Sequence, residues 1–255
     1  MRILVTNDDG IHAPGLRCLE EIAGQLSDDV WVVAPETDQS GVSHSLSLND
    51  PLRLRQAGEK RFAVKGTPSD CIIMGIRHIL KDHGPDLVLS GVNRGQNVAE
   101  DVTYSGTIAG AMEATILGVK AIALSQAYGI GGRANVKWHT AAQHGAATVR
   151  RILDVGIEPG ILVNVNFPDC EPDDVKGLAV AAQGVRNQAL LSIDARMDGR
   201  GNPYFWLAFA KARFEPGHGT DLKAIADGFI SVTPLRLDLT DEPTMTHFAR
   251  VFADG

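Results

Sequence analysis

The chain has few cysteines and no surplus of positive charge, and each of these shortages excludes certain classes of protein or of binding partner. Its three cysteines are spread over 255 residues without a CxxC pair, so we expect neither a disulfide framework nor a zinc site, and a reducing compartment is favoured. The formal net charge of -7 provides no basic field that could hold a polyanion, which argues against long nucleic acid as a partner. A small phosphate ester could still bind at a local site.

Long hydrophobic runs are also missing. The N-terminus, MRILVTNDDG, has a short apolar stretch interrupted by acids and lacks a signal-peptide core. No stretch approaches the roughly 20 apolar residues that a membrane-spanning helix needs. We therefore expect a cytoplasmic protein without membrane segments. The hydrophobic share of 44% is enough to bury the core of one large domain.

Short β-branched runs alternate with longer helical patterns along the chain. Because the runs are apolar on both faces, they resemble the buried strands of a parallel sheet. The alternation predicts βαβ units and a doubly wound α/β sheet, in which ligands bind beyond the carboxyl ends of the strands. The predicted strands are residues 2–6, 30–34, 86–90, 121–125 and 161–166, and the predicted helices are residues 15–26, 69–80, 107–117 and 136–153.

Two segments interrupt this alternation. Residues 44–66 predict a hairpin that projects from the sheet, and residues 175–214 predict an antiparallel extension around a glycine-rich loop. The tail, about residues 236–255, has too few apolar residues for a core of its own, so it must pack on this chain or on a partner chain. We therefore expect a single α/β domain over residues 1–255, with hairpin extensions and a C-terminal oligomerisation tail.

Two adjacent acids, Asp8 and Asp9, follow the first predicted strand. Like charges held together at a partly desolvated sheet edge repel each other, and a hard divalent cation bound by oxygen ligands would offset that repulsion. Gly10 allows the backbone to turn tightly beside such a site. Taken alone, the same residues also fit a solvated Asp-Asp-Gly turn.

Polar residues follow other strands as well. Ser40, after the second strand, offers a hydroxyl, and Asn93, after the third, offers a neutral oxygen ligand or a hydrogen-bond donor. Ser105, Gly106 and Thr107 open a predicted helix, whose free N–H groups and dipole favour an anion. Ordinary helix capping would also use these residue types. Acids at one strand end and an anion cradle at another together indicate a metal-bridged phosphate.

Other enzyme classes on this fold fit less well. A dinucleotide oxidoreductase requires GxGxxG after the first strand, where this chain has NDDGIHAPG, and the P-loop pattern is missing. An aspartyl-phosphate mechanism, with Asp8 or Asp9 as the nucleophile, stays open. His12 and His44 lie near candidate loops and could act as general acid or base.

Several motifs resemble the SurE-type survival-protein nucleotidases. They occur in the order typical of that family and span residues 6 to 235. The matching runs are TNDDGIHAPG, VVAPETDQSG, KGTPSDC, DLVLSGVNRGQN, YSGTIAGAMEA, NVNFP and GTDLKAIADGFISVTPL.

The resemblance implies a Rossmann-like fold and metal-dependent hydrolysis of nucleoside 5′- and 3′-monophosphates, with short polyphosphate as a further substrate of some members. It assigns metal coordination to Asp8, Asp9, Ser40 and Asn93, with Asp8 and Asp9 at the centre of the catalytic site. It also places Asn97 and the Ser105-Gly106-Thr107 turn in the phosphate pocket. Homodimers or homotetramers that exchange C-terminal segments are typical of the family, which would give the apolar tail a use.

We therefore interpret the chain as a phosphomonoesterase that uses one divalent ion per subunit. An oxygen-rich site favours Mg²⁺ or Mn²⁺ over zinc. The main alternative is a nucleotide sensor that binds nucleotide and metal without turnover. The general base, the base preference and the choice between 5′ and 3′ substrates are not determined by the sequence.

Overall fold

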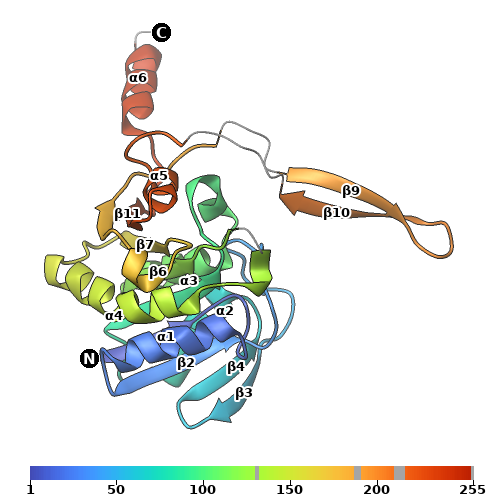
Figure 1. Ribbon diagram of the computed structural model, residues 1–255, viewed down its shortest axis with the longest axis vertical. Coiled ribbons are helices and arrows are strands. Elements are labelled where there is room, and N and C mark those ends of the chain that lie inside the picture. Colours follow the sequence, from blue (N-terminus) through green and yellow to red (C-terminus); the bar gives the residue numbers. More distant parts are fainter. Residues whose placement is uncertain (130–131, 187–190, 210–215, 254–255) are drawn as a thin grey trace.

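The computed structural model describes residues 1–129, 132–186, 191–209 and 216–253. Within these residues, nine strands form one mixed sheet and two more form a separate hairpin (Figure 1). Short 3₁₀ or π turns are labelled η. In chain order the elements are β1 (Arg2–Thr6), α1 (Pro14–Gly24), β2 (Asp29–Pro35), β3 (Arg53–Gly58), β4 (Arg61–Lys65), α2 (Pro68–Met74), η1 (Gly75–Ile79), β5 (Leu87–Arg94), η2 (Ala99–Thr103), α3 (Gly106–Ile116), β6 (Lys120–Gln126), η3 (Gly132–Ala134), α4 (Trp138–Val155), β7 (Ile161–Phe167), η4 (Pro172–Asp174), β8 (Leu178–Val180), β9 (Leu191–Met197), β10 (Pro203–Phe209), α5 (Asp221–Ala226), β11 (Ile230–Arg236) and α6 (Glu242–Ala253).

The main sheet has the strand order β3-β4-β2-β1-β5-β6-β7-β11-β8. Neighbouring strands are parallel except for the β3–β4 and β7–β11 pairs. The predicted mostly parallel, doubly wound α/β sheet is therefore confirmed. Because β1 lies between β2 and β5, the chain that leaves β1 enters the crevice where ligands of such sheets bind.

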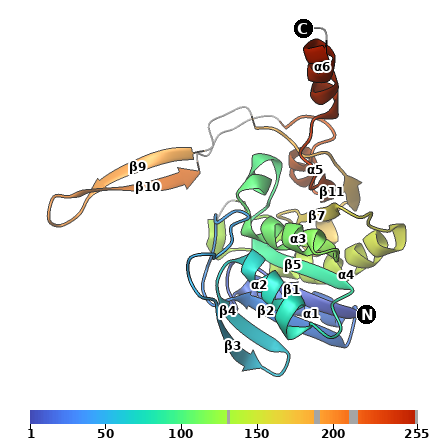
Figure 2. The ribbon, with the colours of Figure 1, turned by 180° about the vertical axis from the view of Figure 1, so that it is seen from behind.

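Helices cover both faces of the sheet, which explains why the strands are apolar on both faces. Along β1, Ile3 and Val5 belong to the core cluster that includes side chains of α1 and α4. Leu4, between them, belongs to the cluster that includes side chains of α2 and α3. The two views show these helix pairs on opposite faces (Figures 1 and 2). Side chains that alternate along each strand thus bury two layers of apolar surface.

One predicted projection is wrong. The hairpin within residues 44–66 consists of β3 and β4, and it continues the main sheet instead of leaving it. Val32 to Pro35 of β2 pair in parallel with Arg61 to Val64 of β4. Backbone groups of β4 are therefore satisfied by the sheet on both sides, and β3 is the edge strand at this end of it.

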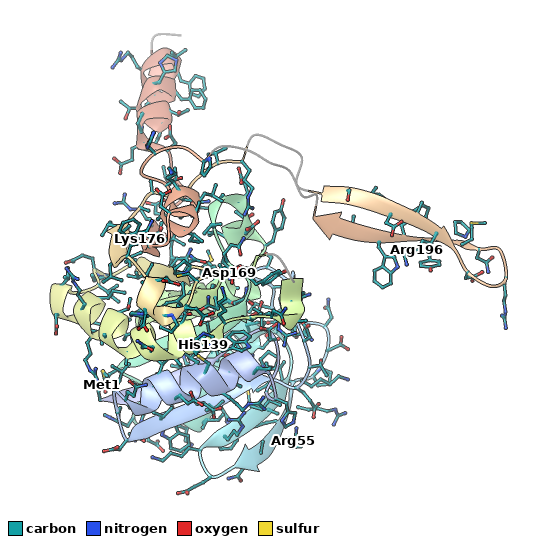
Figure 3. The ribbon with its side chains drawn as sticks, viewed as in Figure 1. Met1, Arg55, His139, Asp169, Lys176 and Arg196 are labelled. Carbon is teal, nitrogen blue, oxygen red and sulfur yellow. The ribbon has the colours of Figure 1, made fainter. Side chains whose placement is uncertain are left out.

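The second predicted projection begins later than expected. β8 joins the main sheet in parallel with β11, so the start of the 175–214 segment belongs to the body. β9 and β10 form the antiparallel ribbon, which extends away from the body (Figure 1). Arg196 lies on this ribbon, far from His139 and Asp169 on the body (Figure 3). Residues 187–190 and 210–214 of the predicted extension lie outside the described residues.

The tail forms a helix that the sequence interpretation did not specify. None of the residues of α6 is buried. Its apolar side chains are largely exposed, with exposed fractions of 54% for Met245, 52% for Phe248, 52% for Val251 and 76% for Phe252. α6 therefore does not pack into the core of its own chain. In the described part of the chain, no helix is both long and apolar enough to cross a membrane.

Candidate functional site

Asp8 and Asp9 lie just beyond the carboxyl end of β1, as predicted. The Asp8 side chain is buried, with only 4% of its surface exposed, and Asp9 is half-buried. The backbone carbonyl of Asp8 accepts a hydrogen bond of 2.8 Å from the N–H of Gln39, in the loop that follows β2. Gly10 has a φ of +98°, which glycine adopts without strain, and this lets the chain turn away directly after the two acids.

The first turn of α3 packs against Asp8. The Thr107 hydroxyl donates a hydrogen bond of 2.6 Å to Oδ1 of Asp8. A Cβ on Gly106 would lie 2.7 Å from the Cβ of Asp8, so only glycine fits there. Ser105 caps the helix through a 3.1 Å bond that its hydroxyl accepts from the N–H of Ile108. The predicted helix opening is thus adjacent to the predicted acid.

The two carboxyl groups are electrostatically strained. Burial raises the pKa of Asp8 from 3.8 to about 7, against the opposing effect of the Thr107 hydrogen bond, and the charges of Asp9 and Asp38 raise it further. Burial also raises the pKa of Asp9, which the backbone N–H of Arg94 partly counteracts. Burial and the neighbouring like charges therefore make it costly to keep both carboxyl groups ionised.

Removing the Thr107 hydroxyl should weaken metal binding without unfolding the chain. In Thr107→Val, Asp8 loses the hydrogen bond that stabilises its ionised form, so its pKa should rise further. We expect about tenfold weaker Mn²⁺ binding at pH 7, the usual scale for a hydrogen bond to a charged group. Calorimetric titration of the purified protein measures the affinity.

Thr115→Val is the matched control for that measurement. Thr115 is also a buried residue of α3, but its hydroxyl donates to the carbonyl of Ala111 on the same helix. Equal Mn²⁺ affinities for the two variants would contradict a role of Thr107 in holding Asp8 ionised.

Asn93 is the last residue but one of β5 and directly precedes Arg94, whose backbone contacts Asp9. The N–H of Arg94 donates a 3.2 Å hydrogen bond to Oδ2 of Asp9. The amide nitrogen of Asn93 donates to the carbonyl of Gly95 at 2.9 Å, which leaves its side-chain oxygen as the atom on offer to a ligand. The predicted strand ended at Ser90, whereas β5 runs on to Arg94 after a register shift between Ser90 and Asn93.

Ser40 is exposed and lies one residue after Gln39, whose N–H binds the Asp8 carbonyl. Its hydroxyl donates to Oδ1 of Asp38 at 2.6 Å. Because the hydroxyl hydrogen is used in this bond, Ser40 would bind a cation through the lone pairs of its oxygen. Asp38, which the sequence interpretation did not single out, therefore both holds Ser40 and adds negative charge near Asp8 and Asp9.

Asn97 is buried in a network of polar side chains. Its amide nitrogen donates to Ser125 at 2.9 Å, and its N–H donates to Oδ1 of Asn166 at 2.7 Å. The carbonyl of Asn97 accepts from the side chains of Asn164 and Asn166. In the sequence, this network could have been inferred from the two asparagines that lie two residues apart in the apolar strand β7. The role of Asn97 in a phosphate pocket stays a prediction.

The two histidines considered as acid or base differ in their surroundings. His44 lies 2.9 Å from the carboxylate of Glu113 on α3, whereas His12 is exposed. These surroundings assign a catalytic role to neither histidine.

The residues around Asp8 fit a hard divalent cation. The donor set consists of two carboxylates, a hydroxyl and an amide oxygen, all of which suit Mg²⁺ or Mn²⁺. Within the described residues, no group of three His, Cys, Asp or Glu side chains could hold a metal ion. Neutral oxygens such as those of Asn93 and Ser40 would therefore have to complete the coordination.

The chain is similar to known proteins over nearly its whole length. The sequence model of the family described as "Survival protein SurE" matches residues 3–189. A protein of Methylobacterium nodulans named "5'-nucleotidase SurE" is 84% identical over 252 residues, which cover 99% of this chain and 100% of that protein. A Methylobacterium radiotolerans protein with the same name is 83% identical over 254 residues, which cover 100% of both chains.

A solved structure agrees in fold. The crystal structure of the Sure protein from Aquifex aeolicus aligns with a TM-score of 0.85 and 39% sequence identity, and the alignment covers 98% of this chain and 99% of that one.

Proposed function

Since the chain belongs to the SurE survival-protein family, we propose that it is a metal-dependent nucleotidase that releases phosphate from nucleoside 5′- and 3′-monophosphates. The observation that carries this proposal is the pair Asp8–Asp9 at the end of β1, with raised pKa values and with the first turn of α3 beside it. A pure phosphate binder gains little from two adjacent acids, because they repel the ligand.

The proposed site holds one divalent ion per subunit, Mg²⁺ or Mn²⁺. Asp8 and Asp9 would bind it through their carboxylates, and Ser40 and Asn93 would add neutral oxygens. When bound, such a cation offsets the negative charge of a phosphoryl group and activates or orients a water.

The protein groups around the ion have separate tasks. The Thr107 hydroxyl donates a hydrogen bond to the Asp8 carboxylate and thereby fixes the orientation of that carboxylate. The N–H groups of Gly106 and Thr107 lie in the first turn of α3 and have no acceptor within the helix. They would donate hydrogen bonds to phosphoryl oxygens. Asn97 would complete the pocket wall, held in place by Asn164 and Asn166 of β7.

We expect a cytoplasmic homodimer or homotetramer in which C-terminal segments are exchanged between subunits. The exposed apolar side chains of α6 and of the β9–β10 ribbon support this, because they find no core in their own chain. Short polyphosphate is a further substrate to test.

Phosphate release from a panel of nucleoside monophosphates tests the proposed activity. With Mn²⁺ or Mg²⁺ we expect turnover of both 5′- and 3′-monophosphates, and with excess chelator we expect none, because the ion is required. Nucleotide that binds with metal present but is never hydrolysed would reject the nucleotidase and favour a sensor.

A further inference from the structure

A buried carboxylate that the proposed site does not use joins three distant segments of the chain. Asp221 is the first residue of α5 and is fully buried. Its Oδ1 accepts hydrogen bonds from the N–H groups of Gly184 at 2.9 Å and of Leu222 at 2.7 Å. Its Oδ2 accepts a third hydrogen bond, of 2.9 Å, from the N–H of Ala99. The side chain thus ties the start of α5 to the segment after β8 and to the start of η2.

Ala99 depends on such contacts because its backbone is in an unfavourable conformation. Its φ of +52° lies in the left-handed region, which residues other than glycine keep only where surrounding contacts hold them there. Asp221 binds the N–H of Ala99, and the side-chain amide of Gln183 donates to its carbonyl at 2.9 Å. Both backbone polar groups of Ala99 are therefore bound by residues that follow β8.

The next residues of η2 are held by the same part of the chain. The N–H of Arg186 donates to the Glu100 carboxylate at 3.0 Å, and the Arg186 guanidinium group forms an ion pair with Asp101. At the end of η2, the N–H of Tyr104 donates to the carbonyl of Asp101 at 3.0 Å. The position of η2 is therefore set by residues far from it in the sequence.

η2 connects the two parts of the proposed phosphate pocket. Asn97 lies two residues before Ala99, and Ser105, which caps α3, lies six residues after it. A shift at Ala99 would therefore displace one or both of these residues. Thr107 is anchored separately, because its carbonyl accepts a 2.7 Å hydrogen bond from the hydroxyl of Ser90 on β5. The proposed metal ligands also lie outside residues 97–107, so such a shift should affect phosphate more than metal.

We propose that Asp221 is a positioning residue for phosphate binding: by holding Ala99, it fixes the places of Asn97 and Ser105. This inference rests on the proposed function, which assigns those two residues to the phosphate pocket. The alternative is that Asp221 only stabilises the fold. In that case its replacement would lower the unfolding temperature and leave phosphate affinity unchanged.

Asp221→Asn tests the proposal. The asparagine oxygen can still accept from Gly184 and Leu222, but its amide group then faces the N–H of Ala99, where two donors cannot bond. At saturating Mn²⁺, inhibition by inorganic phosphate should weaken about fivefold, and KM for a nucleoside monophosphate should rise by the same factor, since a buried hydrogen bond is lost. We expect kcat to change less than KM. Calorimetric titration should give an unchanged Mn²⁺ affinity.

Gln183→Met is the second variant. Gln183 is exposed and the change removes its bond to the Ala99 carbonyl, so the protein should unfold at an unchanged temperature while phosphate affinity falls about twofold. Asp70→Asn is the matched control for Asp221→Asn. Asp70 is also buried, but its carboxylate accepts from the N–H groups of Thr67 and Ser47, outside the 97–107 segment. Phosphate affinity should be unchanged in this control.

Unchanged phosphate affinity in Asp221→Asn would overturn the proposal, and Gln183→Met decides in the same way if Asp221→Asn does not fold. An equal loss in Asp70→Asn, or a parallel loss of Mn²⁺ affinity in Asp221→Asn, would also overturn it, because either shows a general loosening of the chain. If the unaltered protein releases no phosphate from nucleotides, the proposed function fails separately. Calorimetric binding of inorganic phosphate with Mg²⁺ to the same variants then decides the role of Asp221, and no binding to the unaltered protein would reject that role as well.

Discussion

Replacing Asp8 by asparagine is expected to lower metal-dependent phosphate release by about a hundredfold or more, a loss at least as large as that from disturbing a metal's outer ligands. Asparagine has nearly the same shape and keeps an oxygen that can accept the Thr107 hydrogen bond. It removes the charge that would hold the cation, so kcat and metal affinity should fall together. Phosphate release measured over a range of Mn²⁺ concentrations separates the two effects.

The same substitution should leave the fold intact. The ionised Asp8 is costly in the metal-free chain, because it is buried and faces Asp9 and Asp38. Metal-free Asp8→Asn should therefore unfold at the same or a higher temperature than the unaltered protein. Asp82→Asn, at an exposed position, removes one charge elsewhere and should keep full activity. Full activity in Asp8→Asn would show that the cation, if required, binds elsewhere.

The metal-free protein is expected to lose stability as the pH rises from about 4 to about 7, the interval between the ordinary and the raised pKa of Asp8. Below this interval Asp8 is protonated in both the folded and the unfolded chain. Within it, the unfolded chain releases the proton while the folded chain retains it, so ionisation favours unfolding. Above about pH 7 both states are ionised and the effect levels off. The full interval corresponds to at most roughly 4 kcal/mol.

Urea unfolding in chelator at several pH values measures this dependence. The difference between the unaltered protein and Asp8→Asn isolates the contribution of Asp8, because all other titrating groups are shared. With saturating Mn²⁺ the trend should reverse, since the ion binds the ionised carboxylate and is displaced by protons at low pH. Parallel pH profiles for the two metal-free proteins would refute the raised pKa of Asp8 as a source of instability.

Local pattern was enough to predict much of the sheet. β1 and β7 are short apolar runs bounded by polar residues, and both were predicted to within one residue. β11 was missed because Pro234 interrupts its pattern, and proline normally marks the end of a strand. The structure shows why it is tolerated: β8 pairs only with Ile230 to Val232, so the position of Pro234 has no partner on that side.

The sequence by itself determined the residue types of the candidate site and the strand ends on which they lie. Asp8 and Asp9 follow β1, and Ser105 to Thr107 lie at the start of α3. Both placements could be predicted because strand ends and helix starts depend on residues that are close together in the sequence. It did not determine that Thr107 would bond to Asp8, because that contact joins residues 99 positions apart. Likewise, the raised pKa of Asp8 is a consequence of burial, which exists only after the helices close over the sheet.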